Sequence, residues 1–186
     1  RFPFLDHHVA ELAGSLPDVI LNDRQICDFE LLATGVYTPL TGFMRRIDYE
    51  TVLDRCRLES GGLWPMPVCL DISQTLADTL EIGQSVALRD PEGFLLGIMN
   101  VEDLWEHDPE KEAQAIFNTQ DRSHPGVNYL FNRTEAFYIG GEVQAVNLPI
   151  HSDFKQIRRT PDQVRQVFQR LGWKRVVGFH TRQPIH

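Results

Sequence analysis

Hydrophobic residues recur every three or four positions in three stretches of the first 150 residues, a spacing that predicts amphipathic helices. The first helix is predicted over Asn22–Ala33, with Asn22 or Asp23 as its N-cap and Gly35 just beyond its end. The second spans Asp48–Leu58, and a short third one begins at Asp108 and Pro109. The expected apolar faces consist of Tyr49, Val52, Leu53 and Cys56 in the second helix, and of Ala113, Ile116 and Phe117 in the third.

Short apolar runs between these helices predict strands over Val68–Ile72, Val86–Arg89 and Phe94–Val101. The last two are joined by Asp90-Pro91-Glu92-Gly93, which has proline and glycine at positions that a tight turn favours. The segment Phe137–Leu148 is predicted to be a hairpin that turns at Gly140-Gly141. This part of the chain is therefore expected to form a β-rich domain with helical additions.

The last part of the chain has a different pattern. A helix is predicted to start at Thr160 and Pro161, an N-cap followed by proline, and to end before Gly172. Its apolar positions are Val164, Val167, Phe168 and Leu171. The continuous apolar run Val176–Phe179 then predicts a strand buried on both faces of a parallel sheet. Ligands of open α/β sheets bind beyond the carboxyl ends of the strands, so residues 180–186 are expected at a ligand site.

A domain boundary is predicted in the linker between Pro149 and Arg159. It gives a first domain over residues 1–155 and the start of a second over residues 156–186. The chain opens on Arg1 rather than methionine and stops at His186, directly after the predicted strand. We therefore expect both ends to be processing or excision boundaries, and part of the function to reside outside this sequence.

Composition restricts the classes of partner. The formal charge of −8, without a block of lysine or arginine, argues against a broad nucleic-acid or anionic-membrane surface. No apolar stretch approaches the roughly 18 residues that span a bilayer. The three cysteines, Cys27, Cys56 and Cys69, form neither an even disulfide set nor a Cys-x-x-Cys pair, which favours a cytoplasmic location.

Six separated motifs, in order along the chain, resemble the ATP sulfurylase family, also called sulfate adenylyltransferases. The motifs are Asn22-Asp23-Arg24-Gln25-x-Cys27-Asp28, Pro39-Leu40-Thr41-Gly42-Phe43-Met44, Leu63-Trp64-Pro65-Met66-Pro67, Arg89-Asp90-x-Glu92-Gly93, His124-Pro125-Gly126-Val127, and Gly172-Trp173 with the strand after it. The resemblance covers essentially the whole chain.

This resemblance implies an α+β fold, in which a PUA-like N-terminal domain precedes the first helix and strand of a Rossmann-like α/β nucleotidyltransferase domain. It implies sulfate activation, in which sulfate attacks the α-phosphate of ATP to give adenosine 5′-phosphosulfate and pyrophosphate. ATP would enter as its Mg²⁺ complex, without a metal held by the protein. A homo-oligomer and a fused adenylylsulfate kinase domain are further expectations, whereas nucleic acid and membrane are not expected partners.

The family's catalytic motif, Gln-Thr-Arg-Asn-Pro-Met-His, aligns with residues 180–186 of this chain. By resemblance, Arg182 and His180 would bind sulfate, Gln183 and His186 would bind ATP, and Thr181, Arg182 and Gln183 form the catalytic group. A guanidinium offers paired donors that match an oxyanion.

Three positions depart from that motif. His180 replaces glutamine, Gln183 replaces asparagine and Ile185 replaces methionine. Because positioning is central to this chemistry, a shift of about 1 Å at such a position can cost about 100-fold in rate. Two hypotheses stay open: a working sulfurylase with an altered motif, or a catalytically impaired scaffold fused to an adenylylsulfate kinase. RNA binding by the β-rich part is a third, weaker hypothesis.

Several other residues are expected to be structural. Trp64, Trp105 and Trp173 are interpreted as core or domain-interface aromatics, and His124 as a turn residue. The acidic residues Glu102, Asp103, Glu106, Asp108 and Glu110 are interpreted as a solvated face. We expect no zinc site from His180 and His186, because neither cysteine nor carboxylate supports them.

Overall fold

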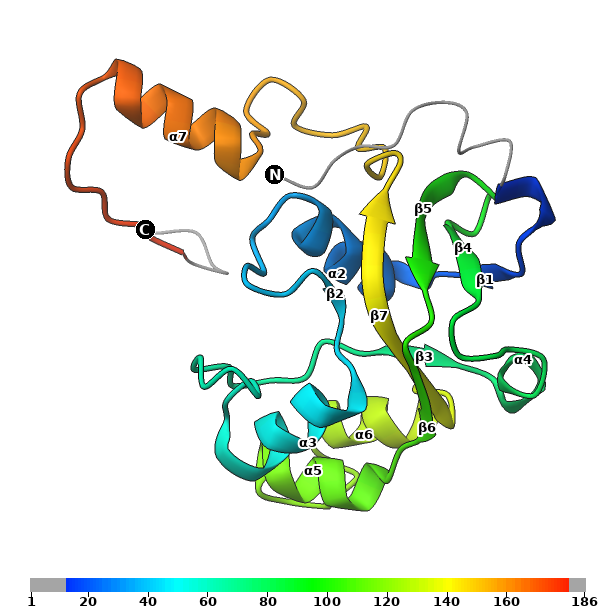
Figure 1. The fold of residues 1–186 in the computed structure, drawn as a ribbon. Coiled ribbons are helices and arrows are strands. Elements are labelled where there is room, and N and C mark those ends of the chain that lie inside the picture. The colour runs from blue at the N-terminus through cyan, green and yellow to red at the C-terminus, as the bar shows by residue number, and fades with distance from the viewer. Residues whose placement is uncertain (1–12, 181–186) are drawn as a thin grey trace. The chain divides into compact units, whose positions relative to one another are not determined.

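The computed structural model describes residues 13–180, and the chain divides after Ile150 into two units. The first unit is mixed, with its helices and strands interleaved along the chain (Figure 1). Its helices are the 3-10 turn η1 (Ala13–Ser15), α2 (Asp23–Ala33), α3 (Arg46–Arg55), α4 (Gln74–Ala77), α5 (Pro109–Phe117) and α6 (Pro125–Asn132). Its strands are β1 (Asp18–Ile20), β2 (Gly42–Phe43), β3 (Leu70–Ile72), β4 (Ser85–Arg89), β5 (Leu95–Asn100), β6 (Asp103–Glu106) and β7 (Phe137–Ala145).

Strand β7 organises the sheet of the first unit. It pairs with four strands, all antiparallel: β3 and β6 along its first half, β2 at Gly141 and Glu142, and β5 along its second half. The sheet then continues through β4 to β1, and the β1–β4 pair is parallel. In Figure 1, β7 runs through the middle of this unit, with α3, α5 and α6 grouped near its first half. One long strand therefore connects the two parts of a curled sheet.

Gly140 and Gly141 allow β7 to exchange neighbours at its midpoint. A Cβ atom at Gly140 would overlap the carbonyl oxygen of Met44, and one at Gly141 would overlap that of Asn100. Only glycine fits, because backbone from two other segments occupies the space in which a side chain would lie. The predicted hairpin at this pair is therefore wrong: the two glycines lie inside a continuous strand.

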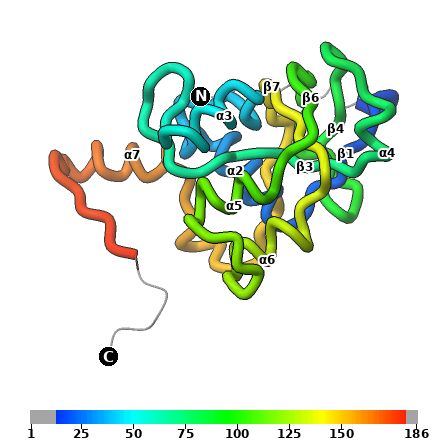
Figure 2. Tube along the Cα trace, turned by 90° about the horizontal axis from the view of Figure 1, so that it is seen from below, coloured from blue at the N-terminus to red at the C-terminus, as the bar shows by residue number. Residues whose placement is uncertain are grey.

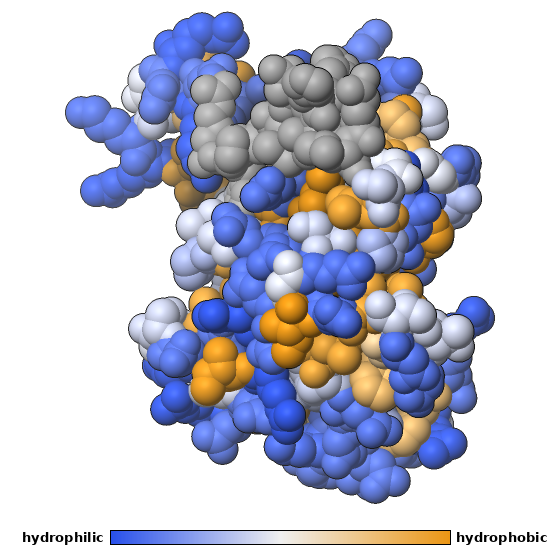
Figure 3. Space-filling model, turned by 45° about the vertical axis from the view of Figure 1, so that its right-hand side comes forward, coloured by the Kyte–Doolittle hydropathy of each residue, from blue (hydrophilic) through white to orange (hydrophobic). Residues whose placement is uncertain are grey.

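The core lies between the sheet and its helices. Its largest fully buried side chains include Phe29 of α2, Phe43 of β2 and Ile139 of β7. On the surface, apolar residues form separate patches within a mostly hydrophilic face (Figure 3). Among the described residues, no helix combines the length and the apolar composition needed to cross a membrane.

A buried carboxylate joins three elements near β6. Oε2 of Glu112, on α5, accepts hydrogen bonds from the hydroxyls of Tyr49 (2.9 Å) and Tyr138 (3.0 Å), which come from α3 and β7. His107 stacks on Tyr138, with ring centroids 4.2 Å apart, and its Nε2 contacts the carbonyl oxygen of Glu135 at 2.9 Å. Burial, and secondly the Glu112 charge, raise the pKa of both tyrosines, which therefore stay protonated as donors.

The structure confirms several predicted elements. Asn22 caps α2 in a capping box with Gln25. The strands predicted over 68–72, 86–89 and 94–101 correspond to β3, β4 and β5, and Asp108 with Pro109 starts α5. The α+β class is confirmed as well.

Other predictions are wrong in detail. Helix α3 begins two residues earlier than predicted and ends at Arg55, so Cys56 is its exposed left-handed C-cap rather than part of the buried face. His124 is no simple turn residue, because its Nδ1 caps α6 by accepting from the backbone N–H of Val127. Part of the acidic stretch forms strand β6, and Trp105 within it is buried.

Within residues 151–180, the described part of the second unit, there is one helix, α7 (Pro161–Arg170), with the predicted Thr160 cap and Pro161 at its first turn. Residues 174–180, in contrast, form no strand, and Val177 is 92% exposed. A parallel strand needs a neighbour in the same sheet, and the described part of this unit supplies none. The prediction of a buried strand is therefore wrong for this chain, and Trp173 is an exposed residue that stacks on Phe168.

We expect Gly140→Ala to lower the free energy of unfolding by about 1–3 kcal/mol, because the added methyl group meets the Met44 backbone. Gly62→Ala is the matched control, since a Cβ there has only the Leu58 side chain near it, at 3.9 Å. Its effect should stay within about 0.5 kcal/mol. Urea denaturation measures both variants, and equal stability of the two would contradict the close approach.

Tyr138→Phe should destabilise the fold by about 1.5–3 kcal/mol, because Glu112 loses a donor. The unfolded chain loses its tyrosine protons near pH 10, whereas folded Tyr138 keeps its proton because its pKa is raised. The stabilising contribution of this phenol is complete below about pH 10 and is lost as the pH rises further.

Native unfolding free energy should therefore fall more steeply above about pH 10 than that of Tyr138→Phe. Denaturation curves recorded at intervals between neutral and strongly alkaline pH provide the comparison. Parallel declines in the two proteins would show that Tyr138 titrates normally in the fold.

Candidate functional site

Only one of the predicted site residues lies in the described part of the chain. His180 is exposed and belongs to no helix or strand. Thr181, Arg182, Gln183 and His186 lie outside the described residues.

Two of the family-like motifs meet at one groove of the first unit, here called the Trp64 groove. It has a volume of about 470 Å³ and is lined by Arg24, Asp28, Tyr37, Leu63, Trp64, Pro65, Met66, Pro67 and Val68. The rings of Tyr37 and Trp64 meet edge to face, with centroids 5.7 Å apart. Leu63 and Met66 remain exposed at 71% and 54%. Segments about 40 residues apart in sequence thus form one largely apolar surface.

Arg24 is the cation of this groove. Its Nη2 donates to Oδ1 of Asp71 at 3.0 Å, its Nη1 lies 3.5 Å from Oδ2 of Asp28, and its guanidinium lies over the ring of Tyr129. Burial opposes the charge, but Asp28 and Asp71 outweigh it and raise the pKa of Arg24. The guanidinium is therefore permanently charged and committed to partners from three elements.

Tyr37 and Asp28, which also line the groove, are hydrogen-bonded to each other. Tyr37 donates its hydroxyl hydrogen to Oδ1 of Asp28 at 3.1 Å. Burial, followed by the Asp28 charge, raises the pKa of Tyr37 to about 12. Burial also raises the pKa of Asp28, against the opposing effect of Arg24. Asp28 therefore joins Tyr37 and Arg24 in one hydrogen-bonded and ion-paired cluster beside the apolar side chains of the groove.

Asp71 is a buried residue that the sequence did not single out. Besides Arg24, its carboxylate accepts hydrogen bonds from Nε2 of Gln25 (2.8 Å) and from the backbone N–H of Glu135 (3.0 Å). Gln25 also caps α2, so one side chain fixes both the helix start and its position on β3. The Asn-Asp-Arg-Gln motif is thereby explained largely as architecture.

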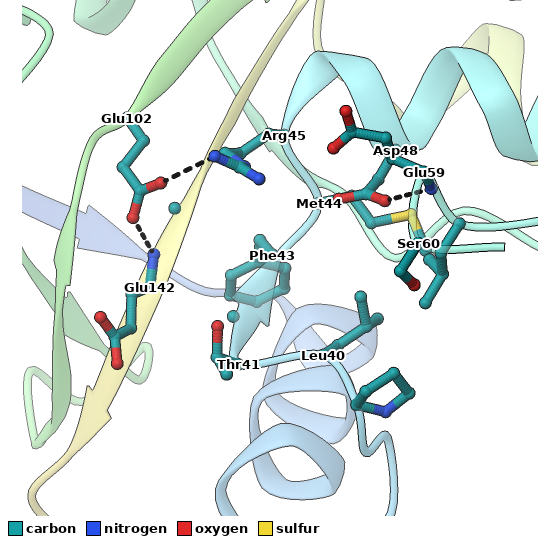
Figure 4. Close-up of a pocket in the computed structure, with 14 residues that line it drawn as sticks. Leu40, Thr41, Phe43, Met44, Arg45, Asp48, Glu59, Ser60, Glu102 and Glu142 are labelled. Atoms are coloured by element: carbon teal, nitrogen blue, oxygen red, sulfur yellow. Dashed lines mark hydrogen bonds and ion pairs between the residues drawn. The ribbon is translucent and has the colours of Figure 1, made fainter. Parts of the chain in front are cut away.

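The Pro39–Met44 motif lines a second hollow, of about 400 Å³, together with Arg45, Asp48, Leu58, Glu59, Ser60, Glu102, Gly141 and Glu142. Figure 4 shows Arg45 directed toward Glu102, and these side chains form an ion pair of 3.7 Å. Glu102 also accepts from the backbone N–H of Glu142, and Asp48 accepts from that of Glu59.

Carboxylates outnumber cations in this second hollow, which disfavours an anionic substrate there. Within the described residues, no group of three or more His, Cys, Asp or Glu side chains could hold a metal ion. The hydrogen bonds of Glu102 and Asp48 serve backbone groups of neighbouring segments. The hollow is thus explained by the crossing of β2, β7 and the loop that contains Glu59.

Comparisons with known proteins connect these motifs to a family. The family model of the PUA-like domain matches residues 5–148, and the ATP-sulfurylase model matches residues 155–186. A sulfate adenylyltransferase of Schizosaccharomyces pombe is 43% identical over 98% of this chain and 38% of its own length. Those of Mycosarcoma maydis and Aspergillus oryzae are 42% and 43% identical over 94% and 99% of this chain.

The chain spans about a third of the length of these curated relatives. A solved structure described as "Hexameric APS kinase from Thiobacillus denitrificans" matches 97% of this chain and 31% of that chain, with a TM-score of 0.77 and 33% identity. The chain thus belongs to the PUA-like domain family over residues 5–148, and it is similar along its length to sulfate adenylyltransferases, with a match to the ATP-sulfurylase model over residues 155–186.

Proposed function

We propose that this chain is part of a sulfate-activating protein that transfers the adenylyl group of ATP to sulfate, giving adenosine 5′-phosphosulfate and pyrophosphate. The observation that carries the proposal is the order of the two family matches, a PUA-like domain followed directly by an ATP-sulfurylase segment. Named sulfate adenylyltransferases support it, because they share about two residues in five with this chain along nearly all of its length. We divide the chain, as the sequence predicts, into residues 1–155 and 156–186.

The proposed chemistry depends on placing two anions against each other. Sulfate is a weak nucleophile, so the protein must hold it near the α-phosphate and balance the charge that develops there. Arg182 takes the role of sulfate ligand, because its guanidinium presents two parallel donors to an oxyanion. His180 is the second sulfate contact, with one donor when its imidazole is neutral.

The remaining residues of the segment are assigned to the nucleotide. Gln183 and His186 bind the ATP phosphates, and His186 stabilises the pyrophosphate as it leaves. Thr181 completes the catalytic group beside Arg182. ATP enters as its Mg²⁺ complex, so the metal belongs to the substrate. We further propose a cytoplasmic homo-oligomer, and the structural relative, which is described as hexameric, supports the oligomeric state.

One observation favours a second candidate function. The structural relative is described as an APS kinase, although this chain matches only 31% of it. In this alternative, residues 1–186 belong to a sulfurylase-like scaffold that is fused to an adenylylsulfate kinase and has lost the first activity. The replacements at His180 and Gln183 support it, because a longer amide and an imidazole alter the geometry on which positioning depends.

The full-length protein should form ATP from adenosine phosphosulfate and pyrophosphate, since the enzyme catalyses both directions of the equilibrium. A coupled luminescence assay measures this product, and kinase activity is assayed on the same preparation. Kinase activity without ATP formation would contradict the proposed function and support the sulfurylase-like scaffold. Absence of both activities from folded protein would overturn both candidates.

Arg182→Ala should reduce ATP formation by about 100-fold or more, because the sulfate group loses its paired donors. Arg182→Lys should recover only part of the rate, since an ammonium group keeps the charge but not the fork. The matched control is Arg175→Ala, an exposed arginine of the same segment outside the motif, which should leave the rate near that of the native protein. Equal rates for Arg182→Ala and the control would show that Arg182 does not bind the sulfate group.

A further inference from the structure

Charge is strongly segregated along this chain. Residues 151–186 contain eight lysines and arginines against two aspartates, a net charge of +6. The first 150 residues contain ten basic and 24 acidic residues, a net charge of −14, so the two parts together give the overall −8. Every reactant of the proposed reaction is an anion, and the first unit repels anions at long range. A local cationic surface is therefore needed to bring them to the site.

The second unit leaves part of its positive charge uncompensated. Its two acidic residues are both paired: Asp153 with Arg158 at 3.3 Å and Asp162 with Arg165 at 2.8 Å. Five other basic residues in the described part of this unit are exposed and have no ion pair. They are Lys155, Arg159, Arg170, Lys174 and Arg175.

Two of these arginines share one face of α7. A hollow of about 380 Å³ is lined by Arg159, Gln163, Gln166, Val167 and Arg170. None of these described lining residues carries a carboxylate, and apart from the hydrogen bond from Nη1 of Arg159 to the carbonyl oxygen of Arg158 (2.8 Å), the donors of the two guanidinium groups can serve a ligand. The backbone N–H groups of Thr160 and Gln163 at the helix start are not available to an anion, because each donates to the side chain of the other residue.

The face suits an extended anion better than a compact one. Arg159 precedes the helix and Arg170 is its last residue, so their charges lie at opposite ends of the hollow. The apolar positions Val164, Phe168 and Leu171 belong to the neighbouring stripe of the helix. A pyrophosphate group, free or at the end of a nucleotide, carries several negative charges, so more than one arginine can attract it.

We infer that the Arg159–Arg170 face of α7 captures the polyphosphate part of the anionic reactants and steers it to the proposed site. The inference rests on the proposed function and adds positioning residues to it. Neither arginine belongs to the catalytic motif at residues 180–186. The effect is on the rate of encounter, so it appears in kcat/KM, while kcat is unchanged.

The test compares two double variants of the full-length protein with the same change in charge. Arg159→Gln/Arg170→Gln removes the unpaired arginines of the face, and Arg158→Gln/Arg165→Gln removes the paired ones nearby. Near 0.01 M salt, where the Debye length is about 30 Å, the first variant should lower kcat/KM for pyrophosphate about threefold or more. The difference in kcat/KM between this variant and the native protein should vanish near 1 M salt, where the Debye length is about 3 Å.

The control variant should keep a kcat/KM close to the native value at both salt concentrations. An equal loss in both variants would show that overall charge acts rather than this face, and a loss in neither would show that α7 does not steer anions. Either result overturns the inference. A thermal melting curve, expected to be native-like in both because all four arginines are exposed, excludes misfolding.

A second readout separates this inference from the proposed function. Binding of inorganic pyrophosphate to the same full-length proteins, measured by titration calorimetry at low salt, needs no turnover. Weaker binding in Arg159→Gln/Arg170→Gln alone supports the face even if no ATP is formed. If the protein turns over but the native protein and both variants bind pyrophosphate equally well, the proposed function is supported and a role of the Arg159–Arg170 face is contradicted.

Discussion

The close backbone approach at Gly140 and Gly141 is the constraint on which the first unit depends. Because neither residue carries a side chain, the backbone at Met44 and Asn100 can reach β7 at its midpoint. The strand then pairs with β3 and β6 before this point and with β5 after it. The Pro39–Met44 motif and the hollow of Figure 4 follow from this crossing, since β2 meets β7 there.

Polar side chains fix the helices onto that sheet. Gln25 and Arg24 attach α2 to Asp71 of β3, and Glu112 attaches α5 to Tyr49 and Tyr138. A view from below shows α5 next to α6 (Figure 2). The ring of His124, which caps α6, lies 4.9 Å from that of Phe117 at the end of α5, measured between ring centroids. Buried polar groups that are hydrogen-bonded in this way favour one arrangement of elements, because moving the elements apart would leave a buried charge unpaired.

Local chemistry explains which features the sequence could predict. Asn22, Asp108 and Thr160 cap helices through contacts within a few residues, and these starts are visible in the sequence. Gly140-Gly141 misleads because a glycine pair favours a turn, whereas here the cause is backbone that arrives from residues 44 and 100. The apolar run at 176–179 predicts a buried strand, but a strand forms only when another strand lies beside it. Asp71 shows no signal, because its three donors come from distant segments.

The motifs of the first unit are mostly architectural, so the proposed chemistry depends on residues 180–186 and on what the second unit adds to them. The most direct test is transfer of labelled sulfate by the full-length protein, supplied with Mg-ATP and with pyrophosphatase to remove the product. We expect label in adenosine 5′-phosphosulfate, formed only when ATP and sulfate are both present. Folded protein that never incorporates the label would contradict it.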